Sequence, residues 1–342
     1  MTREKGRIEV ADLPEPGEPG AGEALLRPQA VGICGSDFHL LAGELETHEL
    51  YGPQFPRIQG HEIGAVIEAV GPGCPEHLQP GARVAVYPLT SCLQCYACRA
   101  GRPNVCANFK LIGIHVDGGL QERFSVPAAQ LFPVGDQDPL TAAFVEPVSI
   151  AVQAVRRARI VPDESVVVLG AGPIGQAILL VAKERGARVL LVDRLPQRLE
   201  LGRANGADPL DLSAVDDLVA YAREWSGGEG PAVVLDATGE PAAIRDGVDM
   251  VAPAGRVVVV GISHKEVTLR VGTFTEKEID LLGSTICGSE QFAEAVEVVG
   301  RNRAAVERLI SRQFGLEEAP DAMDYAMNNP ADVMKVVVRP TA

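Results

Sequence analysis

The sequence predicts an α/β protein in which a parallel-sheet domain is inserted between two parts of a β-rich domain. The first third holds short strand-like runs, such as residues 63–70 and 83–87, separated by Gly and Pro turns. Near residue 150 the pattern changes to apolar strands that alternate with helix-like stretches, which is typical of βαβ units. After residue 286 come a helix-like stretch and a last strand at 335–338. We expect this tail to rejoin the β-rich domain.

The length of the chain favours more than one domain, because 342 residues exceed what a single hydrophobic core usually serves. We predict that residues 1–148 and 287–342 form the β-rich domain, as a partly open barrel. Residues 149–286 are predicted to form the parallel-sheet domain. A cysteine-rich lobe at 88–107 belongs to the first of these.

The parallel sheet is predicted from one strand, turn, helix and strand in succession. Residues 166–169 are continuously apolar, as expected for a strand that is covered on both faces. A glycine-rich turn follows, and then a helix-like stretch at 173–185, where Pro173 suits the first turn because its missing N–H is not needed there. The next strand, 188–192, ends at Asp193. Segments of similar character predict strands at 232–235, 256–260 and 281–283, and helices at 150–158 and 289–301.

Charge and hydropathy exclude several function classes. The formal net charge of −15 disfavours nucleic-acid binding, which depends on Lys and Arg that neutralise phosphates, and it disfavours anionic membrane surfaces. No apolar run reaches the roughly 20 residues that span a bilayer. Residues 1–10 are charged and lack the apolar stretch of a signal peptide. We therefore expect a cytoplasmic protein, in which clustered cysteines indicate metal binding or catalysis rather than disulfides.

Four cysteines in the lobe follow the pattern C-x2-C-x2-C-x7-C: Cys92, Cys95, Cys98 and Cys106. Four thiolates at such short spacings can enclose one zinc ion, which leaves no position for water or substrate. A redox C-x-x-C pair would account for two of the cysteines only. An iron–sulfur cluster is an alternative, but such runs usually have another spacing and a following Pro. The pattern favours a structural zinc site.

A second, mixed set of metal-binding residue types lies outside the lobe. Cys34 follows a predicted strand, and His61 and Glu62 lie in a Gly-flanked segment. A catalytic zinc site needs about three protein ligands and one exchangeable position. Glu146 is a further acidic candidate near the end of the first domain. Each residue alone is a weak indication, and a lone His is more often structural, but the combination predicts an open metal site.

The glycine-rich turn has the form G-x-G-x-x-G and consists of Gly170, Ala171, Gly172, Pro173, Ile174 and Gly175. It follows a predicted strand and precedes a predicted helix, which is the context of a dinucleotide-binding turn. Asp193 lies 18 residues after Gly175, close to the spacing of an acid that binds the adenosine ribose. A carboxylate there repels a 2′-phosphate, so NAD is favoured. Arg194 leaves NADP open, because an Arg at this place can pair with that phosphate.

Five motifs in order, GICGSDFH, GHEIG, the four-Cys lobe, VEP and GAGPIG, resemble the zinc-containing medium-chain dehydrogenase/reductase family over essentially the whole chain. The resemblance implies a Rossmann-type cofactor domain inserted in a GroES-like β-barrel catalytic domain. It implies that Cys34, His61 and Glu62 hold a catalytic zinc. It also places at Glu146 an acid that binds the metal or its water in polyol-type members. Two zinc ions per chain and NAD are therefore expected.

The same resemblance implies a reaction, the transfer of hydride from a secondary alcohol of a sugar acid or polyol to NAD. By that resemblance Ser36 is the relay hydroxyl and His39 passes the proton on to solvent. The family is generally dimeric or tetrameric, and residues 256–262 and 281–286 are the expected edge at which nucleotide domains pair. Family members usually have a short strand before the segment matching residues 6–10, which this chain is expected to lack.

Alternatives remain at the level of substrate. L-threonine 3-dehydrogenases are similar in the Cys lobe and the GHE motif, but tend to carry Asp-Pro where this chain has Glu146 and Pro147. Some family members are non-catalytic binding proteins, which typically lose zinc ligands. His115 either lines the substrate pocket or has a structural role in its loop.

Overall fold

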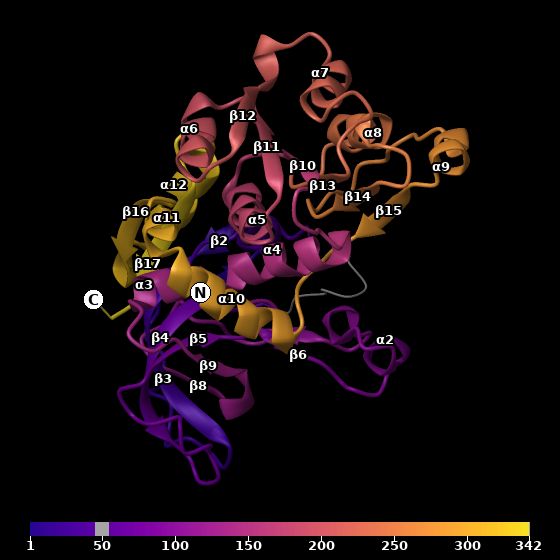
Figure 1. Ribbon diagram of the computed structural model, residues 1–342. Coiled ribbons are helices and arrows are strands. Elements are labelled where there is room, and N and C mark those ends of the chain that lie inside the picture. Colours follow the sequence, from indigo (N-terminus) through magenta and orange to yellow (C-terminus); the bar gives the residue numbers. More distant parts are fainter. Residues whose placement is uncertain (45–54, 342) are drawn as a thin grey trace. The chain divides into compact units, whose positions relative to one another are not determined.

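A computed structural model describes residues 1–44 and 55–341. The chain divides into two compact units (Figure 1). The first comprises Met1–Glu146 together with Gly288–Ala342, and the second comprises Pro147–Cys287. Across the described residues, no helix is both long and apolar enough to cross a membrane.

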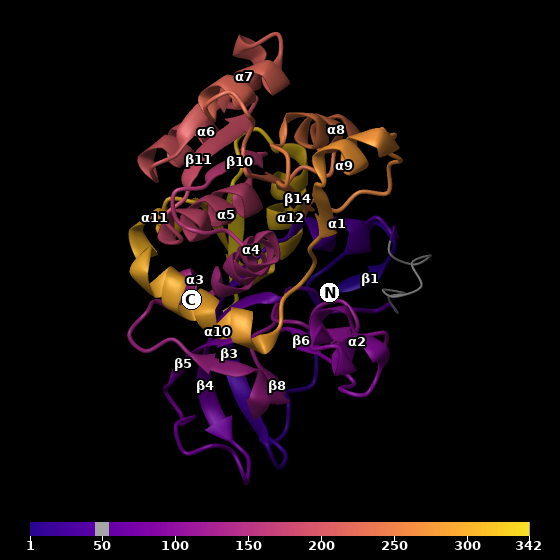
Figure 2. The same cartoon turned by 45° about the vertical axis from the view of Figure 1, so that its right-hand side comes forward.

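The first unit is built on a sheet in the order β16-β17-β3-β4-β5-β9, in which β8 also pairs with β3 (Figure 1). β16 and β17 run parallel, and the other pairs of this sheet, including those of β3, β4, β5 and β8 labelled in Figure 2, run antiparallel. Alternate residues of β4, namely Ile63, Ala65 and Ile67, point into the core, as the two-residue period of a strand requires. The strands of this unit are β1 (Thr2–Glu4), β2 (Arg7–Ile8), β3 (Glu23–Gly32), β4 (Glu62–Val70), β5 (Arg83–Val86), β6 (Leu89–Thr90), β7 (Lys110–Leu111), β8 (Phe124–Pro127), β9 (Leu131–Pro133), β16 (Ile310–Gly315) and β17 (Lys335–Arg339).

The helices of this unit range from four residues in α2 and α3 to 13 residues in α10. One contact shows how closely they pack: a methyl group at Gly64 in β4 would come 1.9 Å from the carbonyl oxygen of Pro139. Glycine at this position therefore lets α3 rest directly on the strand. The helices are α1 (Gly35–Leu41), α2 (Tyr96–Arg99), α3 (Pro139–Ala142), α10 (Ser289–Arg301), α11 (Arg303–Glu307) and α12 (Ala319–Asn328).

The prediction that no strand precedes residues 6–10 is wrong. β1 forms a hairpin with β2, and Thr2 also makes an isolated bridge with Arg57. Three residues are too few to show the alternating apolar pattern by which a strand is recognised, so only the pairing of β1 in the folded chain defines it.

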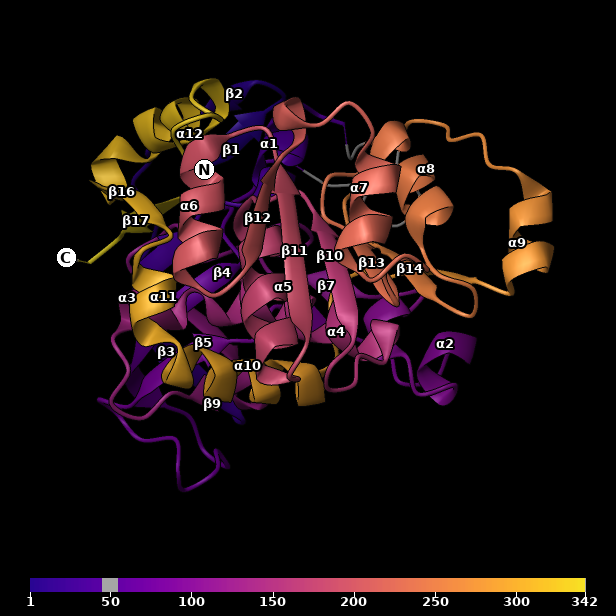
Figure 3. The same cartoon turned by 45° about the horizontal axis from the view of Figure 1, so that its top comes forward.

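The second unit contains a six-stranded parallel sheet in the order β12-β11-β10-β13-β14-β15 (Figure 3). This is the doubly wound order 3-2-1-4-5-6, whose direction of winding reverses between the first and fourth strands. The fold class predicted from the sequence is therefore confirmed. The strands are β10 (Ser165–Leu169), β11 (Arg188–Asp193), β12 (Asp208–Asp211), β13 (Val233–Asp236), β14 (Arg256–Val259) and β15 (Asp280–Gly283).

Helices cover both faces of this sheet. Val167 and Leu190 pack in one cluster with residues of α7 and α8. On the other face, a methyl group at Gly202 of α6 would come 2.2 Å from Leu191, so that helix lies against β11. Continuous apolar strands follow from this double cover. The helices are α4 (Val145–Ala158), α5 (Pro173–Glu184), α6 (Pro196–Ala204), α7 (Leu218–Trp225), α8 (Pro241–Met250) and α9 (Val271–Lys277).

The edge of the sheet differs in part from the expectation. β15 is an edge strand, as predicted for residues 281–286, but β14 lies between β13 and β15. Residues 256–259 are therefore interior, which fits the burial of Val257 and Val258.

Candidate metal and cofactor sites

Cys34 lies at the junction of β3 and α1, where it is the N-cap of the helix. Its backbone N–H donates to a carboxylate oxygen of Asp37 at 2.9 Å, the reciprocal bond of a capping box. The thiol is thus held at a turn whose backbone conformation is fixed by a buried acid.

His61 and Glu62 are positioned by a second loop that pairs with the segment preceding them. The backbone N–H groups of Gly118, Gly119 and Leu120 donate to the carbonyls of residues 58, 60 and 59 at 2.8, 2.9 and 3.1 Å. A methyl group at Gly118 would come 2.3 Å from the carbonyl oxygen of Gly60, so the two backbones can approach only without a side chain there.

The structure brings the predicted open-site residues together. One ligand atom from each of Cys34, His61 and Glu62 lies within 4.8 Å of the others. Thiolate, imidazole and carboxylate are the donor types that zinc prefers, and three protein ligands leave a position for substrate. The donor set therefore fits a catalytic zinc ion. Among the described residues, Glu146 is outside this group, although it is buried and interacts electrostatically with His61 and Glu62.

The charges of the site shift several pKa values. Burial raises the pKa of Glu146 to about 7, against the opposing effect of His61. Burial lowers the pKa of His61, but Cys34, Asp37 and Glu146 outweigh it and raise that pKa well above its usual range. Buried acids of like charge would hold each other protonated, whereas a bound dication would favour their ionised forms.

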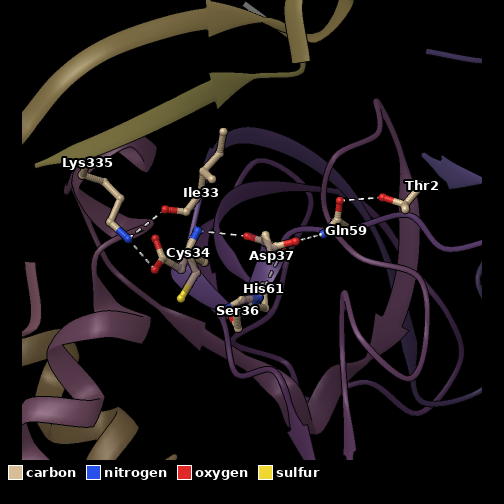
Figure 4. Close-up of polar contacts among 9 residues, drawn as sticks. Thr2, Ile33, Cys34, Ser36, Asp37, Gln59, His61 and Lys335 are labelled. Atoms are coloured by element: carbon tan, nitrogen blue, oxygen red, sulfur yellow. Dashed lines mark hydrogen bonds and ion pairs between the residues drawn. The ribbon is translucent and has the colours of Figure 1, made fainter. Parts of the chain in front are cut away.

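Two residues of the site were not predicted from the sequence. Asp37 is 1% exposed, and its Oδ1 lies 3.9 Å from His61 Nδ1 (Figure 4). Within the described part of the chain neither atom has a hydrogen-bond partner, which suits an acid that orients a metal-binding imidazole. Lys335 begins β17 and donates to Glu62 Oε1 at 2.6 Å. The spacing from Cys34 to Asp37 is a detectable signal for the first residue, but nothing local indicates the second.

The two predicted relay residues differ in their surroundings. Ser36 Oγ lies 3.4 Å from His61 Nε2, at the edge of the candidate metal site. The His39 side chain is 37% exposed, and its Nδ1 lies 2.5 Å from Glu44 Oε2. Ser36 is thus close to the candidate ligands, and His39 reaches solvent from the same helix.

The four lobe cysteines converge as a second group, with their sulfur atoms all within 4.8 Å. α2 carries Cys98 and begins after Cys95, whose sulfur lies 3.5 Å from that of Cys98. Backbone N–H groups of Gln94 and Cys95, with Cys106, lower the pKa of Cys92 to about 6. Burial and the thiols of Cys95 and Cys106 raise the pKa of Cys98 to about 12 instead, so a bound zinc ion would itself have to ionise that thiol.

The glycine-rich turn joins β10 to α5 at the reversal point of the parallel sheet. Gly170 has φ +95°, and a methyl group at Gly175 would come 1.8 Å from the Gly170 carbonyl oxygen. α5 begins with Gly172 as a cap that has no side chain, followed by Pro173. The turn therefore has the close strand–helix packing and exposed helix N-terminus that fit a dinucleotide pyrophosphate.

Asp193 ends β11 and reaches back to this turn. Its Oδ2 accepts from Ala171 N at 2.6 Å, and its Oδ1 accepts from Arg194 N at 2.7 Å and Leu195 N at 3.0 Å. Arg194 is exposed, and an Nη atom of Arg198 lies 3.6 Å from where a methyl group at Gly172 would be. Asp193 and the Arg198 guanidinium thus lie beside the glycine turn, and Arg194 follows Asp193 in the chain.

His115 has a structural contact in its own loop. Its Nδ1 accepts from Leu111 N at 3.0 Å, and its ring packs edge-on against Phe109. Of its two predicted roles, this geometry favours the structural one.

Comparison with known proteins agrees with this architecture. Residues 20–136 match the alcohol dehydrogenase GroES-like domain, and residues 173–301 match the zinc-binding dehydrogenase domain. L-galactonate-5-dehydrogenase of Escherichia coli (strain K12) is 35% identical over 320 residues, which cover 94% of this chain and 92% of that protein.

Two solved structures extend the comparison to cofactor-bound proteins. A zinc-binding dehydrogenase of Sinorhizobium meliloti 1021 bound to NADP is 32% identical with a TM-score of 0.89, covering 99% of this chain and 98% of that one. The alcohol dehydrogenase rspB of Escherichia coli CFT073 with NADH is 29% identical with a TM-score of 0.88, at the same coverage. The chain therefore belongs to the zinc-containing medium-chain dehydrogenase/reductase family, whose members are oxidoreductases of alcohols that use zinc and a nicotinamide dinucleotide.

Proposed function

We propose that this protein oxidises a secondary alcohol of a sugar acid or polyol with NAD as hydride acceptor. The observation that carries the proposal is the convergence of Cys34, His61 and Glu62 within 4.8 Å in a chain that also holds a dinucleotide turn. The substrate class follows from the 35% identity with an L-galactonate dehydrogenase. L-galactonate is a sugar acid with several secondary hydroxyls.

The roles of the residues follow from their positions. Cys34, His61 and Glu62 would hold the catalytic zinc, with Glu146 beside them, and the four lobe cysteines would hold a structural zinc. When bound, the catalytic zinc supplies Lewis acidity to the substrate hydroxyl and the nicotinamide ring accepts the hydride. Ser36 Oγ, next to His61, would take up the substrate hydroxyl proton as it releases its own, and His39 would pass a proton to solvent from the exposed face of α1.

NAD is proposed as the cofactor because Asp193 lies at the end of β11 against the glycine turn. Its carboxylate would repel a 2′-phosphate. Arg194 and Arg198 would favour the 2′-phosphate of NADP, so we expect a preference for NAD rather than complete exclusion of NADP. Comparing kcat/KM for NAD and NADP measures it directly.

The decisive experiment is reduction of NAD and NADP with a panel of sugar acids, polyols, threonine and simple secondary alcohols. We expect NAD-linked turnover of a sugar acid or polyol. Turnover of threonine alone would assign the protein to the rival dehydrogenase branch. If the zinc-loaded protein reduced neither cofactor with any alcohol of the panel, the proposed substrate class would be contradicted.

A ligand variant separates the metal site from the fold. Cys34→Ala should abolish turnover and remove one of two zinc ions per chain, while the melting temperature stays close to that of the wild type. Cys287→Ala is a suitable control, since Cys287 is buried and contacts Ser149 Oγ at 3.0 Å outside both cysteine-containing sites. Full activity of Cys34→Ala would refute the ligand assignment.

We propose further that the protein is a cytoplasmic homodimer or homotetramer that pairs through β15. The edge strand leaves Leu281 39% exposed. An uncovered, apolar strand edge is a ready site for pairing with a second copy.

A further inference from the structure

The ammonium group of Lys335 is buried beside the candidate catalytic metal site, and it is not a ligand. Lys335 is 4% exposed, and its Nζ donates to Glu62 Oε1 at 2.6 Å and to the carbonyl of Ile33 at 3.1 Å (Figure 4). A buried ion pair rarely contributes net stability, because desolvation of the two charges offsets their attraction. Packing alone could be provided by an apolar residue at the start of β17. The charge therefore calls for a functional explanation.

The Glu62 carboxylate lies between Lys335 and the backbone of Gly32. Lys335 engages Oε1, and a methyl group at Gly32 would come 2.0 Å from Oε2. Gly32 and Lys335 belong to β3 and β17, which pair with each other. Gly32 thus leaves the room that Oε2 occupies, and the hydrogen bond from Lys335 holds the carboxylate through Oε1.

The ammonium and a bound zinc ion would compete for the same carboxylate. Cys34, Asp37 and Glu146 supply further negative charge at the site. Among the described residues, the Lys or Arg side chain that forms an ion pair with a residue of the site is Lys335. We propose that Lys335 is a positioning residue that withholds Glu62 Oε1 from the catalytic zinc and so keeps a coordination position open for the substrate oxygen. This inference rests on the proposed zinc-dependent function.

The proposal predicts opposite changes in metal retention and in turnover. In Lys335→Met, Glu62 is released and binds the metal more completely. We expect zinc loss to a chelator to slow by about tenfold or more, the size of effect typical of residues that support metal ligands. Turnover should fall by a similar factor because the open position is occupied. A merely structural role would instead weaken metal retention and the fold together.

Cobalt substitution gives a readout that does not depend on activity. The Co²⁺ d–d absorption should weaken in Lys335→Met, because it loses intensity when coordination rises from four to five ligands. Cys34→Ser removes the thiolate-to-cobalt charge-transfer band of this site and so identifies its signal. If the wild type shows no Cys34-dependent band, the proposed zinc site fails, and this inference fails with it.

Two further variants control for folding and charge. Lys335→Arg keeps a cationic donor and should return zinc loss and the cobalt spectrum towards those of the wild type. Glu62→Gln/Lys335→Met removes both charges, and should lose metal at the same rate as Glu62→Gln. If Lys335→Met alone does not fold, the comparison of these two Glu62→Gln proteins still tests whether Lys335 acts through Glu62. Faster metal loss or an unchanged cobalt spectrum in Lys335→Met, or a difference between the two Glu62→Gln proteins, would overturn the proposal while leaving the zinc site intact.

Discussion

At the scale of single residues, Asp37 connects the two halves of the candidate metal site. Its Oδ2 accepts from the backbone of Cys34 at 2.9 Å, and its Oδ1 faces His61 Nδ1 at 3.9 Å. The imidazole can then present Nε2 to a metal on the side of Cys34. An acid that fixes the tautomer of a ligand is part of many zinc sites. Gln59 supports this acid from behind, since its Nε2 donates to the carbonyl of Asp37 at 2.8 Å.

The orienting role of Asp37 can be tested with an isosteric substitution. Asp37→Asn should weaken zinc binding by about 10–100-fold, because the amide N–H₂ would favour the His61 tautomer that carries its proton on Nε2. Zinc dissociation constants measured by chelator competition check this. Asp236→Asn is a matched control, since Asp236 is a buried acid of the second unit. Unchanged affinity in Asp37→Asn would show that the acid serves only the cap of α1.

The raised pKa values predict how metal binding depends on pH. A protonated imidazole cannot bind zinc, and the pKa of His61 is raised well above its usual range while that of Glu146 is about 7. Protons therefore compete with the metal as pH falls, so affinity should increase with pH through and above neutrality. For each proton displaced, the apparent Kd should fall about tenfold per pH unit. Competition titrations between pH 6 and 8 test this, and a constant Kd over that range would contradict it.

At the scale of elements, short strands and loops define the sites, and the regular elements hold them in place. The cysteine lobe, residues 88–107, contains only β6, α2 and a turn of 3₁₀ helix at Pro103–Val105. Such a lobe has little apolar core of its own, because no residue of α2 is buried. Its order should therefore depend on the metal that its four thiolates bind.

Removal of one lobe thiolate should loosen this segment locally. Cys98→Ser should lower the zinc content by one ion per chain and speed proteolysis within residues 88–107 by about tenfold, equivalent to ~1.4 kcal/mol of local stability. Without the metal, the free energy of metal binding no longer stabilises the folded lobe. Cys74→Ser is the control, as the Cys74 thiol donates to the Glu23 carbonyl at 3.1 Å outside the cluster. Equal cleavage rates and zinc contents in Cys98→Ser and the wild type would rule out the structural zinc site.

At the scale of the whole molecule, the proposed assembly depends on the exposed edge of the parallel sheet. Leu281→Arg in β15 should weaken self-association by more than about 2 kcal/mol, roughly 30-fold in Kd, because it would place a charge in a desolvated contact. Light scattering after size exclusion measures the mass against 36.1 kDa for one chain. Tyr221→Arg in α7 changes a residue of the same unit that is 37% exposed, against 39% for Leu281, and should have no effect. A wild type that is monomeric at micromolar concentration would refute the assembly.

Much of the fold was accessible from local patterns. Apolar runs and the glycine turn predicted β10, α5 and β11 to within one residue at each end. Continuous burial and turn geometry depend on residues that are neighbours in the sequence, so local patterns reveal them. The residue types of both metal sites were also visible, since the spacing of cysteines and the Gly-flanked His61 are local features.

The sequence by itself determined which donors this protein offers to metals and cofactor, and in what order they occur. The tertiary structure alone decided how those donors are held. Lys335 reaches Glu62 across 273 positions because β17 pairs with β3 and β3 pairs with β4. Strand pairing of this kind follows from the packing of distant apolar surfaces, which no short stretch of sequence encodes. The hydrogen bonds and buried charges that tune a site therefore become known only when the chain is folded.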